Sequence, residues 1–137
     1  MYILFGDEIL DSEELKEIIE TQTEFTVEKD LSKASKREDI LAYRISIDIE
    51  TLNDELKKEF DIDEMDEAEL FDEYMTLSDE LGVELEELMP EHARLNMRAY
   101  KMDTSDNTIK GVVVISHYSL NELKLIDVTK RLLSQVE

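Results

Sequence analysis

The chain has 137 residues and 42% hydrophobic content, which fits one globular domain long enough to bury a core. Its formal net charge of −21 is extreme, and such a field repels nucleic acids and anionic membranes while it attracts basic proteins. Because cysteine is absent, disulfides and thiolate chemistry are excluded, and nothing in the composition indicates an oxidising compartment.

The first forty residues predict three short elements. These are a strand at 2–5, a helix at about 12–22 and a strand at 25–27. Asp11 and Glu14 have the spacing of a capping box at the start of the helix. The polar stretch 28–39 is expected to form a loop or a weak helix.

Residues 41–49 give the strongest strand pattern, because apolar and other side chains alternate strictly. A central strand of the sheet is therefore predicted here. The residues expected on its apolar face are Leu41, Tyr43, Ile45, Ile47 and Ile49.

An acidic helical region is predicted over about 51–91. Thr51 is the expected cap of a first helix, and a second helix is expected over about 64–81, closed by Gly82. On a helical wheel the second helix has an apolar side and a charged side. The apolar side is expected to contain Ala68, Leu70, Phe71, Tyr74, Met75, Leu77 and Leu81, and the charged side Asp66, Glu69, Asp72, Glu73, Asp79 and Glu80.

The last third predicts a β-hairpin from 94–102 and 108–116, followed by a helix that packs on the sheet. Ser119 and Glu122 have the spacing of a capping box for this helix. The expected order is β-α-β-β-α-α-β-β-α. This order predicts a single α+β domain, 1–137, with three or four mainly antiparallel strands.

Residues 59–91, the acidic segment, hold fifteen Asp or Glu residues among thirty-three positions and no Lys or Arg. An uncompensated charge block is ordinarily disordered because it has too little apolar area to offset chain entropy. Here apolar residues recur at helical spacing, so the carboxylates are expected to be held in fixed positions. If fully helical, the acidic segment would extend about 50 Å and carry one charge per 3.3 Å or so, close to the spacing of about 3.4 Å between phosphates along one DNA strand.

The sequence carries no metal or catalytic motif. Asp61 could begin a calcium loop, but Asp66 stands where the sharp turn needs glycine and Asp72 where a bidentate glutamate belongs. His92 and His117 are the only histidines, and neither belongs to an HExxH pattern. The grouping of His117 with the two residues after it resembles an active-site corner, although a structural histidine beside a helix cap is the simpler interpretation.

Cofactors and direct nucleic-acid binding are not expected. With three glycines in the chain, no glycine-rich phosphate cradle can form. The basic groups around Lys36 and Arg98 do not outweigh the acidic field. In size and charge pattern the chain resembles the small acidic DNA mimics that phages and mobile elements direct against restriction and CRISPR nucleases, and this resemblance transfers no residue roles.

The leading hypothesis is an inhibitor that occupies the nucleic-acid groove of a basic enzyme, as an anti-restriction or anti-CRISPR protein does. The alternative is an immunity protein or antitoxin that neutralises a basic toxin, and a third is a non-inhibitory acidic adaptor. In each case the protein is expected to be cytoplasmic, not an enzyme, and without cofactor, metal or membrane contact. The carboxylates expected to contact the partner are Glu59, Asp61, Asp63, Glu64, Asp66, Glu67, Glu69, Asp72, Glu73, Asp79, Glu80, Glu84, Glu86 and Glu87.

Overall fold

A four-stranded antiparallel sheet of order β3-β4-β6-β5 forms the centre of the fold, in a computed structural model that describes residues 1–136. Its strands are β3 (Thr26–Asp30), β4 (Ile40–Asp48), β6 (Thr108–His117) and β5 (Ala93–Asp103). The predicted α+β class, the 94–116 hairpin and the central position of the strand predicted at 41–49 are confirmed. The prediction was wrong for Ile49, because the strand ends at Asp48 and Ile49 begins the next helix.

The two inner strands, β4 and β6, pair without interruption from Ile40↔Ser116 to Asp48↔Thr108. The apolar alternation of β4 places Leu41, Tyr43 and Ile45 in one core cluster, as predicted. The other face of the strand contributes Ile40 and Ala42 to a second, smaller cluster. Both faces of the sheet are therefore covered, which explains why nearly every residue of these two strands is buried.

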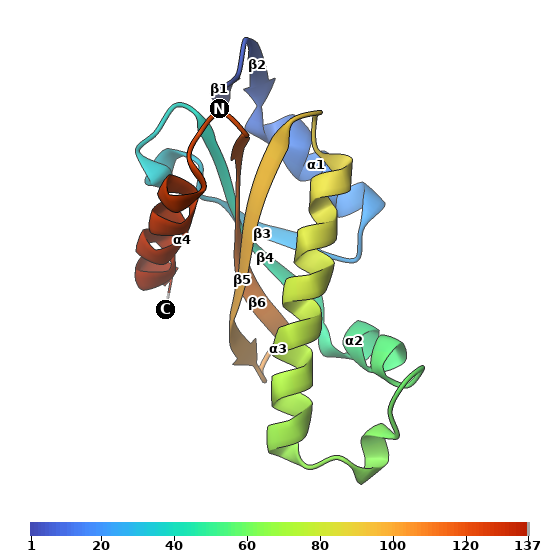
Figure 1. The fold of residues 1–137 in the computed structure, drawn as a ribbon. Helices are drawn as coiled ribbons and strands as arrows, with labels where there is room; N and C mark the ends of the chain where they lie inside the picture. The colour runs from blue at the N-terminus through green and yellow to red at the C-terminus, as the bar shows by residue number, and fades with distance from the viewer. Residues whose placement is uncertain (137) are drawn as a thin grey trace.

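Helices cover the sheet from two sides (Figure 1). Those that contribute to the larger cluster are α1 (Ser12–Gln22), α2 (Ile49–Leu56) and α3 (Glu67–Val83). α4 (Glu122–Val136) packs on the opposite face, so the expectation that the last helix packs on the sheet is confirmed. Short 3₁₀ turns occur at η1 (Lys33–Ser35), η2 (Ile62–Glu64) and η3 (Glu84–Leu88). Within residues 1–136, no helix combines the length and apolar character needed to cross a bilayer.

Two short segments differ from the predicted pattern. The N-terminal strand β1 (Tyr2–Phe5) pairs with a second strand, β2 (Glu8–Asp11), as a separate hairpin that the sequence pattern missed. β3 continues through Asp30, so the prediction of a loop from residue 28 was wrong at its start. The observed order is therefore β-β-α-β-β-α-α-β-β-α.

Two of the predicted helix caps were wrong. α2 begins at Ile49, which places Thr51 inside its first turn. Ahead of α4, the side chain of Asn121 accepts a hydrogen bond from the backbone N–H of Leu123 at 2.7 Å. The hydroxyl of Ser119 instead lies 2.7 Å from Nδ1 of His117.

The prediction that Gly82 closes the acidic helix was wrong, because Gly82 lies inside α3. A Cβ atom added at this position would lie 2.2 Å from Cγ of Met97 on β5. Glycine is therefore required here by the close approach of the helix to the sheet and not by a helix stop.

We expect Gly82→Ala to lower the free energy of unfolding by about 1–2 kcal/mol. Alanine gains about 1 kcal/mol of helix propensity, but overpacking against Met97 costs more. Chemical denaturation of the wild type, the two single variants Gly82→Ala and Met97→Ala, and the double variant measures the effect. In the Met97→Ala background, the glycine substitution should be neutral or stabilising, and an unchanged penalty there would contradict the packing explanation.

Candidate functional site

The acidic segment is anchored through the inner side of α3. Tyr74, Ser78 and Gly82 are buried at intervals of four residues and face the sheet. The hydroxyl of Tyr74 donates a hydrogen bond to Oδ1 of Asn53 at 2.5 Å, which ties α3 to α2. After the helix, Leu85 is buried in η3. These contacts show that the acidic segment is folded and not a tail.

The apolar side of α3 is narrower than predicted. Leu70, Met75, Leu77 and Leu81 pack against the core as expected. Ala68 and Phe71, however, are exposed. The first turns of α3 extend past the end of the sheet toward the α2–α3 connection, so less core is available to cover them (Figure 1).

The carboxylates of the acidic segment are almost all at the surface. All of them are exposed except Glu73 and Asp79, which are half-buried. Every ion pair recorded for residues 1–136 lies outside the acidic segment. The segment therefore presents negative charge that its own chain does not neutralise.

Two of the expected partner-binding carboxylates have structural roles. Oδ1 of Asp66 accepts a hydrogen bond from the backbone N–H of Glu69 at 2.8 Å and caps α3. Oδ1 of Asp79 accepts one from the backbone N–H of Ala99 at 2.7 Å, at the β-bulge of the edge strand β5. The sequence carried no signal for the second contact, because a bulge cannot be located from the pattern of β5.

The predicted charged side of α3 is divided by its surroundings. Glu73 and Glu80 turn toward α2, where they line a hollow of about 190 Å³ together with Glu55 and Glu59. Asp79 turns the other way, toward β5. The exposed carboxylates that remain on the outside of the helix are Asp66, Glu67, Glu69 and Asp72.

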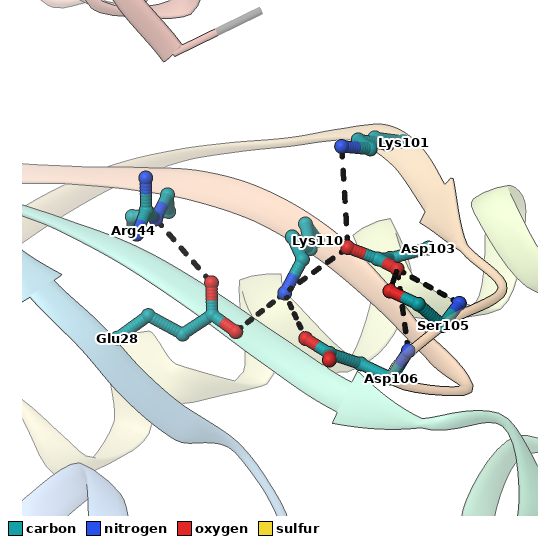
Figure 2. A network of polar contacts seen from close by, with 7 residues as sticks. All are labelled: Glu28, Arg44, Lys101, Asp103, Ser105, Asp106 and Lys110. Atoms are coloured by element: carbon teal, nitrogen blue, oxygen red, sulfur yellow. Dashed lines mark hydrogen bonds and ion pairs between the residues drawn. The ribbon is translucent and has the colours of Figure 1, made fainter.

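Several of the chain's cations are paired with carboxylates outside the acidic segment, across strands β3, β4 and β6 (Figure 2). Nζ of Lys110, on β6, lies 2.6 Å from Oε2 of Glu28 and 2.9 Å from Oδ2 of Asp106. Nε of Arg44 lies 3.3 Å from Oε1 of the same Glu28. Lys110 is only 8% exposed, so this network belongs to the fold and leaves these cations unable to neutralise α3.

The ionisation of this network is fixed by its hydrogen bonds. Burial alone would lower the pKa of Lys110, but hydrogen bonds to Glu28 and Asp106 outweigh it and raise the pKa. Hydrogen bonds from the Ser105 hydroxyl and nearby backbone N–H groups lower the pKa of Asp103. The lysine therefore stays charged and the aspartate ionised near neutral pH.

The only two histidines lie together at one end of the sheet. The ring of His117 meets Phe5 edge-on, with centroids 5.2 Å apart, and lies 6.1 Å from the ring of His92. Nδ1 of His117 accepts a hydrogen bond from the backbone N–H of Ser119 at 3.1 Å. The grouping of His117 with the two residues after it, which resembled an active-site corner in the sequence, has the geometry of a packed turn. Among residues 1–136 no three His, Asp or Glu side chains form a group that could hold a metal ion.

The overall arrangement is a folded array of anionic groups. α3 has 17 residues and is about 25 Å long, and the chain bends at η2 and η3, so the acidic segment does not reach the length of about 50 Å expected for one continuous helix. Comparison of the chain with protein families, with curated proteins and with solved structures finds no match. The chemistry that this surface offers is electrostatic attraction to a basic partner.

We expect Asp79→Ala and Asp72→Ala to have different effects on stability. Loss of the hydrogen bond to Ala99 should lower the free energy of unfolding by about 1–3 kcal/mol, whereas removal of the exposed Asp72 should change it by less than about 0.5 kcal/mol. Urea denaturation measures both. Equal effects would show that the carboxylate of Asp79 does not hold the edge strand.

Proposed function

We propose that this protein is an inhibitor that occupies the nucleic-acid-binding groove of a basic enzyme, in the manner of an anti-restriction or anti-CRISPR protein. The observation that carries the proposal is the set of exposed carboxylates in 59–91 that have no ion-pair partner in the described chain yet are mounted on folded elements. We propose a cytoplasmic site of action, where enzymes of this kind work.

Fixed charge of one sign disfavours the helix that carries it. Pairs such as Glu69/Glu73 and Glu80/Glu84 are four residues apart, and each like-charge pair of this kind costs about 0.2–0.5 kcal/mol. Solubility alone can be obtained from charges scattered over the surface. Concentration of the charges on one helical region is better explained by a partner that supplies the missing cations.

Charge density supports imitation of a nucleic-acid backbone. Along the length of α3, about 25 Å, lie Asp66, Glu67, Glu69, Asp72, Glu73, Asp79 and Glu80. Counted over all seven, this corresponds to about one carboxylate per 3.6 Å, against about 3.4 Å between phosphates of one DNA strand. The seven do not form a single row, because Asp79 is bonded to β5 and Glu73 and Glu80 turn toward α2. A groove lined with Lys and Arg for phosphate binding would meet a similar density of negative charge.

Apolar side chains exposed among the carboxylates favour a second candidate, an immunity protein or antitoxin that neutralises a basic toxin. Phe60 is 41% exposed, Phe71 39% and Val83 52%. Phosphates have no apolar counterpart, so these groups suit a protein surface that is matched to this protein specifically. An acidic adaptor that binds without inhibition is the third possibility.

The partner can be captured from a lysate of the source cells at low and then moderate salt, and its complex challenged with duplex DNA. A nucleic-acid mimic must be displaced by the duplex, and its affinity must fall steeply with salt. Inhibition of the partner without competition from DNA would favour the immunity protein. A partner that binds DNA and this protein together, with neither weakened, would favour the adaptor.

We expect simultaneous reversal of Glu69, Asp72 and Glu80 to Lys to weaken binding of the captured partner by about a hundredfold or more. Like charges brought together across an interface cost several kcal/mol. Asp79 is left intact because it holds β5. The matched control reverses Glu13, Glu17 and Glu20 on α1, which are exposed, and should weaken binding less than about fivefold. Similar losses from both triple variants, measured by titration calorimetry, would contradict a localised site.

A further inference from the structure

A hollow of about 440 Å³ lies where α1, α2, α3 and η3 meet the start of β3. We call this hollow the trough. Its apolar lining includes the buried side chains of Phe25, Ile47 and Leu85. Leu81 and Leu88, which are half-buried, also line it. The lining residues come from three separate stretches of the chain, 22–25, 47–55 and 81–88, so the trough exists only in the folded protein.

Carboxylates are the only charged groups that line the trough. They belong to Glu24, Glu55, Glu84 and Glu87. Of these four carboxylates, only that of Glu55 has a cationic partner within residues 1–136. The partner is Lys58, at 3.0 Å in a pair that is exposed to solvent. Beside the trough, the smaller hollow between α2 and α3 shares Glu55 and adds Glu73 and Glu80.

We propose that the trough binds an amphipathic basic segment of the partner, with an apolar side chain on its floor and Lys or Arg side chains against its carboxylates. The inference deepens the proposed function, on which it rests for the existence of a basic partner. It assigns the apolar anchor of that complex to the trough and leaves the exposed carboxylates of α3 to supply the ionic contacts around it.

Charge complementarity selects this occupant. An apolar ligand alone would leave the carboxylates of Glu84 and Glu87 without partners, and a nucleic acid would be repelled by them. A Lys or Arg side chain satisfies both parts of the trough, because its aliphatic stem packs on apolar surface while its charged end reaches a carboxylate. A helix placed in a groove with apolar anchors at i, i+4 and i+7 is a recurrent form of such recognition.

Two synthetic probes test the proposal in about 0.15 M salt, where diffuse attraction is screened. One is a helical peptide with leucines at i, i+3, i+4 and i+7 and lysines elsewhere, and the other is an oligolysine of equal net charge. By fluorescence anisotropy the amphipathic peptide should bind at least about tenfold more tightly than the oligolysine. In NMR spectra of the full chain, the amides it shifts should include those of Phe25, Leu85 and Leu88.

Matched variants locate the binding. Reversal of Glu24, Glu84 and Glu87 to Lys should weaken peptide binding at least about tenfold, whereas the same reversal at Asp7, Glu122 and Asp127, exposed and away from the trough, should weaken it less than about threefold. Leu88→Ala should weaken binding of the amphipathic peptide and leave oligolysine unchanged. Circular dichroism verifies that each variant is folded.

Equal affinity for the two probes, no binding of either, or shifts confined to residues 66–73 would overturn the proposal. None of these results bears on whether a captured enzyme competes with DNA. Conversely, a captured partner that binds DNA and this protein together would refute the inhibitor while the peptide result remained valid. The two claims can therefore fail separately.

Discussion

Burial of the inner side of α3 against β5 and β6 is the interaction on which the acidic surface depends. Full burial of a large apolar side chain contributes about 1.5–3 kcal/mol, several times the penalty of a single like-charge pair on the outside of the helix. Tyr74 on the helix and Leu85 directly after it are both buried. The close contact at Gly82 and the hydrogen bond from Ala99 to Asp79 fix where the helix lies against β5. The helix therefore holds its carboxylates in fixed positions. In an isolated peptide of this composition, the same carboxylates would prevent folding.

Much of the fold could be predicted because its elements follow simple periods. The strict alternation of β4 identified both its faces and its central position, and the capping position of Asp11 located α1. The second strand of the N-terminal hairpin was missed because four residues, Glu8–Asp11, show no alternation. Glu28 was assigned to a loop because its side chain is polar. That side chain is accommodated on a strand by its contact with Lys110, which only the assembled sheet creates. Gly82 looked like a stop for the same reason, since its neighbour Met97 lies on another element.

The candidate site could be predicted only in outline. Composition and helical period identified the exposed carboxylates, because an unpaired charge must remain in water. They could not show that Asp79 is used by β5, or that Glu80 turns toward α2. The trough was beyond sequence analysis, because Phe25, Ile47 and Leu88 are far apart in the chain. Long-range packing thus divides one predicted acidic face into surfaces with different roles.

The acidic helix is folded without internal neutralisation of its charge. Amide hydrogen exchange across residues 67–83, at neutral pH and low ionic strength where repulsion is greatest, tests this most directly. We expect the amides of the buried turns from Tyr74 to Gly82 to be protected almost as strongly as those of β4. Exchange of those amides at the rate of an unprotected chain, while β4 stays protected, would contradict it.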